Sequence, residues 1–259
     1  MKSGTIYIGT SGWMYKDWAR DLYPAGMKQG HLAYFASEFK TVEVNSSFYH
    51  LPLKSTFKKW HDETPEWFIF AVKLSRYITH QKRLRGSRRA LERFMRRAAP
   101  LADKIGTILV QLPPSLAFDE KVLRRFLEDM DIVKKRTFHA SFVLEPRHIS
   151  WFSAEHLPLL AACMKEAGVA LVFAHSASIP SIAPERTNIF SDIVYIRFHG
   201  PQTFASSRYG ARRLKPWAER MLLWASEGKT VFAYFNNDVH GHAIHDARTL
   251  IRQCGHAHA

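Results

Sequence analysis

Charged and amide side chains stand at the ends of several apolar segments of this chain, and they are of the types that enzymes use. Glu43 and Asn45 end one such segment, and Glu145 and Arg147 end another. Charged groups are rarely buried unless they are paired or bind something. We therefore expect a polar, partly hydrated pocket where these segments end.

Other apolar segments of the chain also end in polar residues at alternate positions. The polar positions at the segment ends are Lys73 with Ser75, Gln111, Arg197 with His199, and Asn236 with Asp238 or, in a register shifted by one, Asn237. Positions of the opposite parity stay largely apolar. Alternate residues of a strand point to one face, so these groups are expected to converge. A network of ion pairs that only stabilises the fold is the alternative, although buried pairs barely offset their desolvation.

Two carboxylates in unequal environments are a common solution for acid/base chemistry. A glutamate beside Lys73 or Arg147 should have a lowered pKa, and one that faces tryptophan a raised pKa. Such a pair suits glycoside or ester hydrolysis, or proton abstraction next to a carbonyl. The candidate catalytic residues are Glu43, Glu145, Lys73 and His199.

The same set of side chains is rich in cations. Arginine presents a planar fork that matches carboxylate and phosphate oxygens, and Arg76, Arg147 and Arg197 would stand beside Lys73 and His199. A small anionic ligand is the predicted partner. We predict no metal and no cofactor, because a positive lining disfavours a cation. One observation favours a metal site. His240, His242 and His245 have H-x-H-x-x-H spacing, and His175, His199 and Asp238 could be further ligands.

The elements that must position these groups are eight strand-like segments separated by amphipathic stretches. The strand-like segments begin at Thr5, Thr41, Trp67, Ile105, Phe138, Gly168, Asp192 and Thr230. Helices are predicted after an Asp119 cap, between a Ser153 cap and Gly168, and around Leu214 to Trp224. Prolines in the stretch after the sixth strand predict a loop there. This rhythm predicts an α/β fold of the (β/α)8 TIM-barrel type, as one domain over residues 1–259, with the site at the carboxyl ends of the strands. A doubly wound sheet is the alternative, but "GTSGW" lacks its glycine spacing.

Composition narrows the class of protein. The chain has 259 residues, of which 46% are hydrophobic, and no apolar run long enough to cross a membrane. Its first residues lack the pattern of a signal peptide. Two cysteines in unrelated contexts argue against a disulfide framework. We expect a cytoplasmic protein without membrane contact.

The net charge of +14 is concentrated in one place. Residues 82–97 hold eight basic side chains against Glu92, which is half of the excess. A basic stripe from Lys82 to Arg97 can bind DNA or RNA by releasing counterions, and nucleic-acid binding or processing is the alternative function. A solvated helix face with Leu91 and Phe94 turned inward would explain the same pattern.

The segments "GTSGW", "VEVNSSFYHLP", "FAVKLSRYITH", "QLPP", "LEPRHISW", "YIRFHG" and "YFNND" resemble, in this order, the signature segments of the DUF72 family. The likeness extends from about Ile6 to about Leu250. It implies a TIM-barrel-like fold and no particular reaction, so a hydrolase, a lyase or an isomerase all fit.

The resemblance also implies a set of site positions. Carried over by motif, they are Trp13, Glu43, Asn45, Phe48, Tyr49, Lys73, Arg76, His80, Gln111, Glu145, Arg147, Trp151, Arg197, His199, Asn236 and Asn237. Two positions depart from the family pattern. His175 stands where an aspartate is usual, which would alter a contact at the pocket rim. Asp246 stands where an asparagine is usual, and it is interpreted as a detail of the last helix.

Overall fold

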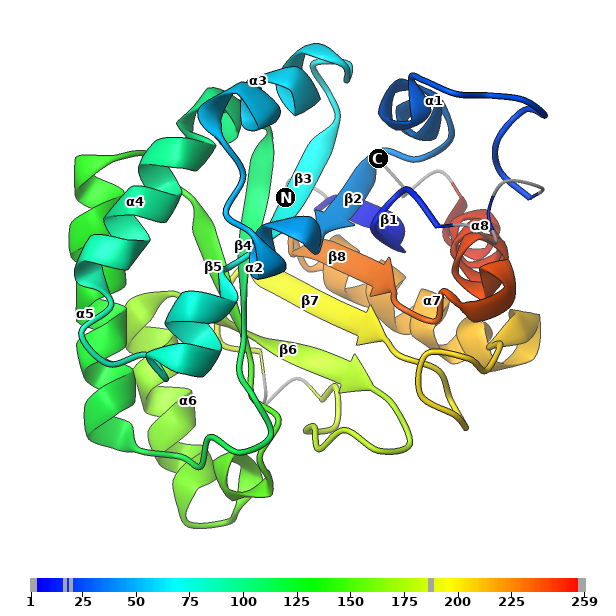
Figure 1. The fold of residues 1–259 in the computed structure, drawn as a ribbon. Coiled ribbons are helices and arrows are strands. Elements are labelled where there is room, and N and C mark those ends of the chain that lie inside the picture. Colours follow the sequence, from blue (N-terminus) through cyan, green and yellow to red (C-terminus); the bar gives the residue numbers. More distant parts are fainter. Residues whose placement is uncertain (1–3, 16–17, 19–20, 186–188, 256–259) are drawn as a thin grey trace. The chain divides into compact units, whose positions relative to one another are not determined.

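A computed structural model describes residues 4–15, 18, 21–185 and 189–255 (Figure 1). Its eight strands are β1 (Ile6–Ser11), β2 (Thr41–Val44), β3 (Ile69–Lys73), β4 (Ile105–Gln111), β5 (Ser141–Glu145), β6 (Ala170–His175), β7 (Ile193–Phe198) and β8 (Thr230–Phe235). They form a closed parallel barrel in sequence order. Each strand falls within its predicted segment, so the sequence-based prediction of a (β/α)8 barrel is confirmed.

The chain groups into two compact units. Unit 1 comprises residues 1–43, 173–179 and 192–259, and unit 2 comprises residues 44–172 and 180–191. The divisions fall inside β2 and β6. That residues 1–259 form a single domain remains a prediction from the sequence.

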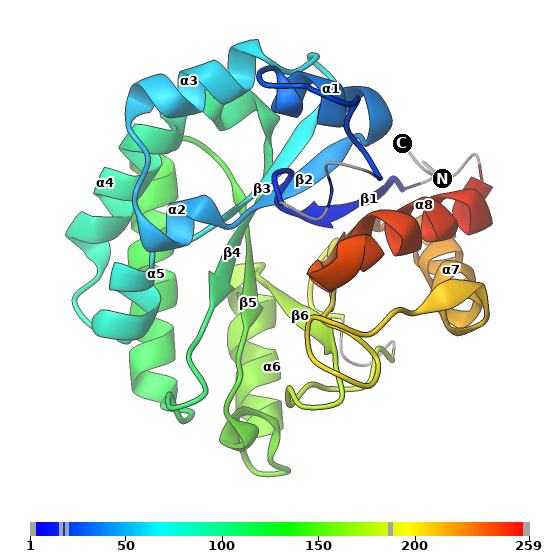
Figure 2. The ribbon, with the colours of Figure 1, turned by 45° about the vertical axis from the view of Figure 1, so that its right-hand side comes forward.

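Helices follow most of the strands. Unit 1 contains α1 (His31–Glu38), α7 (Gly210–Ser226), the single turn η6 (Val239–Gly241) and α8 (His242–Cys254). Unit 2 contains α2 (Ser46–Tyr49), α3 (Lys54–Asp62), η2 (Tyr77–Gln81), α4 (Arg88–Ala98), η3 (Ala99–Lys104), α5 (Glu120–Arg136), η4 (Ile149–Phe152) and α6 (His156–Ala167). Helix α4 lies beside α5 in unit 2 (Figure 1), and α8 beside α7 in unit 1 (Figure 2).

Local signals set most helix ends. Asp119 accepts the N–H of Val122 at 3.1 Å and caps α5 as predicted. Gly168 ends α6 in the left-handed conformation, with φ of 62°. The predicted Ser153 start of α6 is too early, because the helix begins at His156, although Ser153 Oγ accepts the His156 N–H. Among the described residues between β6 and β7 there is no helix, in agreement with the prediction of a loop.

The alternation of side chains in β7 decides which groups face the barrel interior. Phe198 stacks on Phe235 with ring centroids 4.6 Å apart and meets Trp217 of α7 edge to face at 5.2 Å. This face of β7 therefore packs on the helix. Tyr195 and Arg197 have the other parity, so they point away from α7 and into the barrel. Both are buried.

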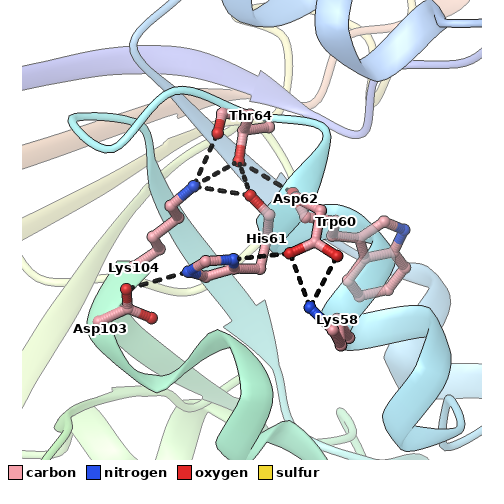
Figure 3. Close-up of polar contacts among 7 residues, drawn as sticks. All are labelled: Lys58, Trp60, His61, Asp62, Thr64, Asp103 and Lys104. Atoms are coloured by element: carbon pink, nitrogen blue, oxygen red, sulfur yellow. Dashed lines mark hydrogen bonds and ion pairs between the residues drawn. The ribbon is translucent and has the colours of Figure 1, made fainter.

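A buried lysine ties the end of α3 to the start of β4 (Figure 3). Lys104 Nζ donates to the carbonyl oxygens of His61, in the last turn of α3, and of Thr64, just after it, both at 2.7 Å. The His61 ring lies 3.1 Å from a carboxylate oxygen of Asp62 and 3.1 Å from one of Asp103. These contacts lie at the amino-terminal end of β4. That end of a barrel strand serves stability.

The described part of the chain holds no helix with the length and apolar character needed to span a membrane. Both cysteines, Cys163 and Cys254, are free and buried.

Candidate functional site

The best-defined polar cluster of unit 1 surrounds Glu43 at the end of β2. Arg197 donates from Nη2 to Oε1 at 2.7 Å and from Nε to Oε2 at 2.9 Å. Ser11 and Tyr195 add their hydroxyls, one to each carboxylate oxygen, at 2.7 Å. Glu43 and Arg197 are 0% and 1% exposed. Four donors therefore hold this carboxylate in a fixed position.

The backbone of β1 allows this arrangement because it approaches β2 closely. A Cβ atom at Gly9 would lie 2.2 Å from the Thr41 carbonyl oxygen, so only glycine fits there. The register pairs Ser11 with Glu43. Burial by itself would raise the pKa of Glu43, but the Arg197 guanidinium, with Ser11 and Tyr195, lowers it below its ordinary value. Glu43 is therefore ionised at neutral pH and is a poor proton donor.

Asp238, just beyond β8, has the opposite character. Its pKa is raised to about 8, chiefly by burial and also by the Glu43 charge, while contacts with the Tyr15 hydroxyl and Arg197 oppose this shift. The Tyr15 hydroxyl donates its proton to the Ser11 carbonyl oxygen at 2.5 Å. Asp238 Oδ1 is buried and has no hydrogen-bond partner among the described residues. This carboxyl group can gain or lose a proton near neutral pH.

His199 extends the cluster from the end of β7. Its Nδ1 lies 3.1 Å from Asn236 Nδ2, and its Nε2 lies 3.5 Å from Arg197 Nη1. The Phe204 ring stacks on the imidazole at 5.5 Å. The structure therefore brings Glu43, Arg197, His199 and Asn236 into one network, as the alternation of polar side chains predicted.

Asn237 belongs to a different network. Its Nδ2 donates to Asp246 Oδ2 at 2.9 Å and to the Ser207 carbonyl oxygen at 3.0 Å. Asp246 also accepts the backbone N–H groups of Tyr209 and Gly210, at 2.9 and 3.0 Å. This buried carboxylate holds the start of α7 against the end of β8. The interpretation of Asp246 as a detail of the last helix is wrong.

His175 likewise contacts protein groups. Its Nδ1 lies 2.9 Å from the Tyr209 hydroxyl, and its ring meets Trp217 of α7 edge to face. The imidazole therefore packs between the end of β6 and α7.

Unit 2 carries a second polar cluster, which is cationic. Lys73 Nζ, at the end of β3, lies 4.1 Å from the centroid of the Phe48 ring. The His80 ring meets the same phenylalanine edge to face at 4.9 Å. The pKa of His80 is lowered to about 4, first by burial and then by the charges of Lys73, Arg76 and Arg147. A neutral imidazole among three cations marks a place where negative charge is favoured.

Glu145 ends β5 in this unit. Arg147 donates to Glu145 Oε1 from Nε at 2.7 Å and from Nη2 at 2.6 Å. Glu145 is fully buried, whereas the Arg147 side chain is 15% exposed. The register pairs Gln111 of β4 with Glu145, and Gln111 Nε2 donates to the Leu112 carbonyl oxygen at 2.6 Å. Gln111 thus fixes the local backbone.

The other predicted binding residues of unit 2 differ in exposure. Tyr49 is 69% exposed and can meet a ligand, whereas Asn45 Oδ1 is buried and has no hydrogen-bond partner among the described residues. Trp151 is different. It is 1% exposed and donates its indole N–H to the Leu116 carbonyl oxygen at 2.7 Å. The expectation that Trp151 lines the site is wrong, because the ring packs in the core against Phe118.

The remaining predicted aromatic, Trp13, belongs to unit 1 and is half-buried. Its carbonyl oxygen accepts a hydrogen bond from the Tyr23 hydroxyl.

Sequence reasoning missed Ser11 and Tyr195 and ranked Asp238 below its neighbours. Tyr195 stands two residues before Arg197, and Asp238 two residues after Asn236, so the alternation itself was the available signal. For metals, no group of three or more histidine, cysteine, aspartate or glutamate side chains in the described ranges is placed to hold an ion.

The barrel and its polar strand ends define the class, a parallel (β/α)8-barrel protein. The chain belongs to the family described as "Protein of unknown function DUF72", whose model matches residues 7–259. The UPF0759 protein YecE of Escherichia coli K12 is 29% identical over 181 residues, which are 69% of this chain and 62% of YecE. The match therefore spans less than two-thirds of YecE.

Two further proteins are similar over almost their whole length. The UPF0759 protein YunF of Bacillus subtilis 168 is 26% identical over 277 aligned positions, covering 95% of this chain and 93% of YunF. The crystal structure of a DUF72 family protein from Thermotoga maritima MSB8 is 26% identical, with a TM-score of 0.79 over 96% of this chain and 98% of that protein.

Proposed function

We propose that this chain is a barrel enzyme that uses carboxylate acid/base chemistry on a small anionic substrate, which is phosphorylated, carboxylated or sugar-like. The observation that carries the proposal is a pair of carboxyl groups in unit 1 whose pKa values are pushed apart. The pKa of Glu43 is lowered, and that of Asp238 is raised to about 8. Such a separation is how acid and base roles are divided in active sites.

The roles follow from the contacts. Asp238 exchanges a proton with the substrate, because its pKa lies near the working pH and one of its oxygens is unpaired. The Glu43–Arg197 pair is a fixed electrostatic element, since four donors saturate the carboxylate. This assignment replaces the expected pairing of Glu43 with Glu145 as acid and base.

The charge of the substrate is inferred from unit 2 taken by itself. Lys73, Arg76 and Arg147 act together on His80, and Glu145 is the carboxylate that Arg147 binds. This excess of cations suits carboxylate or phosphate oxygens.

The test is a turnover screen. The protein is incubated in D2O with a panel of sugar phosphates, hydroxy acids and glycosides, and deuterium uptake and product formation are followed by NMR. We expect conversion or exchange of one class, with a rate that changes around pH 8, and loss of at least about 100-fold in Asp238→Asn.

Asp192→Asn is the matched control, because the Asp192 side chain is 97% exposed and pairs with Lys229. It should retain full activity. Equal rates for Asp238→Asn and the wild type, or no reaction with any class by the folded protein, would contradict the proposal.

The alternative function, nucleic-acid binding through residues 82–97, requires the basic side chains to be available. Arg83 donates to Ser115, Arg85 pairs with Asp119, and Arg88 pairs with Asp129. Arg97 donates to the carbonyl oxygens of Leu51 and Pro52. Four of the eight basic residues thus hold the loop and α4 in place, so the segment is not one continuous basic stripe.

A further inference from the structure

Four basic residues of the segment 82–97 line a cavity of about 570 Å³ in unit 2, between η2 and α4. Arg89, Arg93 and Arg97 recur at four-residue spacing and so share one face of α4, and Lys82 joins them from the preceding loop. Among the described residues that line the cavity none is acidic. Like charges one turn apart repel, so this face is arranged for an anion that comes from outside.

The rest of the lining is apolar and aromatic. Leu51, Ile78, Ala90 and Phe94 contribute to it, and Phe94 is fully buried. Tyr77 is 50% exposed, and Lys82 Nζ lies 5.6 Å from its ring centroid. The cavity therefore offers an apolar floor, an accessible aromatic face and a cationic wall.

The segment that carries Tyr77 and Lys82 has an unusual backbone. Residues 77–81 form a π-helical turn, a feature that is frequent at functional sites. Arg83 and Leu84 follow with φ of 50° and 69°, values that non-glycine residues rarely adopt. Leu84 is 2% exposed, and Arg83 is held by two bonds to Ser115, so the surroundings maintain this conformation. Strain that is maintained in this way clusters at ligand sites.

We propose that this cavity binds a mononucleotide, with the phosphates on Arg89 and Arg93 and the base against Tyr77. Arginine forks match phosphate oxygens, and bases stack on aromatic rings. The volume lies within the roughly 300–1,000 Å³ of small-molecule sites. The cavity shares no lining residue with the group proposed for catalysis, so either proposal can fail alone.

The chemistry of phosphate and base is shared by free nucleotides and by nucleic-acid strands. The experiment is isothermal titration calorimetry of the full chain with ADP, with pyrophosphate, with adenosine and with a single-stranded hexanucleotide. We expect ADP to bind more tightly than pyrophosphate or adenosine, and at least as tightly as the hexanucleotide. Affinity should fall as salt is added.

Two variants remove the same charge from the same helix. Arg93→Gln should weaken ADP binding about tenfold or more, the effect of one lost charge-assisted hydrogen bond. Arg96→Gln should change it less than about twofold, because Arg96 is exposed and does not line the cavity. Tyr77→Ala should weaken ADP and leave pyrophosphate unchanged.

Three outcomes would overturn the proposal. The first is no heat with millimolar ADP from the folded protein, and the second is an equal loss in Arg93→Gln and Arg96→Gln. The third is a hexanucleotide that binds far more tightly than ADP, which would assign the cavity to a strand.

Discussion

The two polar clusters contain the same residue types but differ in their balance of charge. In unit 1 an arginine and a glutamate are both buried and joined by two hydrogen bonds, with two hydroxyls completing the carboxylate. In unit 2 the glutamate is equally buried, but its arginine is partly exposed and two further cations act on His80. The first cluster is balanced in charge, and the second carries an excess of positive charge.

This difference distinguishes a cluster that stabilises the fold from one that is suited to bind an anionic ligand. A balanced, buried pair needs no external partner, which is why the proposed proton exchange is assigned to its neighbour Asp238. An unbalanced group of cations is stabilised by an anion. Residue type alone does not distinguish the two cases, whereas burial and pairing do.

The largest expected effect comes from breaking the balanced pair. Arg197→Met leaves Glu43 charged and buried, which should lower the free energy of unfolding by about 3–5 kcal/mol. Urea unfolding measures the loss. The double variant Glu43→Leu/Arg197→Met should be more stable than the single variant, and Arg147→Met should lose less because that side chain is partly exposed. Equal losses for Arg197→Met and Arg147→Met would remove the contrast between the clusters.

A hydroxyl that supports Glu43 should have a smaller effect. Ser11 is fully buried and donates to the carboxylate at 2.7 Å. Ser11→Ala should cost about 1.5–3 kcal/mol, the range for a hydrogen bond to a charged group. The measurement is again urea unfolding, with the partly exposed Ser176→Ala as control. A loss no larger than that of the control would show that Arg197 alone holds Glu43.

Asp238 should make the protein less stable as the pH rises. Its pKa in the folded protein is about 8, above the ordinary 3.8, so the fold binds a proton that the unfolded chain has released. The free energy of unfolding should therefore fall as the pH rises from about 4 to about 8, and level off above that. Asp238→Asn should lack this fall. Parallel curves for the two proteins would mean that the carboxyl group is already ionised at pH 6.

The smallest expected effect is a shift in one titration. Lys73→Met removes one of the charges that lower the pKa of His80, while burial, the largest cause, stays. The pKa should rise from about 4 by less than about one unit, as measured by NMR of the imidazole nitrogens. Lys58→Met, at an exposed pair with Asp62, should leave it unchanged. A fall in the His80 pKa would contradict the cationic character of this cluster.

Much of the fold was predictable because its signals are local. Alternating apolar runs placed the eight strands, and Asp119 and Gly168 marked helix ends through their own hydrogen bonds and backbone conformation. The family motifs located the polar strand ends. The helix start at Ser153 was placed too early because Ser153 caps a turn that precedes the helix.

What the sequence determined by itself is therefore the barrel and the list of polar groups at its strand ends. Which of them pair was decided by the tertiary structure, since Glu43 and Arg197 are 154 positions apart along the chain. The same holds for the raised pKa of Asp238 and for the division of the basic segment into structural and cavity-lining residues. Electrostatic interactions depend on distance in space and on burial, and neither quantity is encoded in any single stretch of residues.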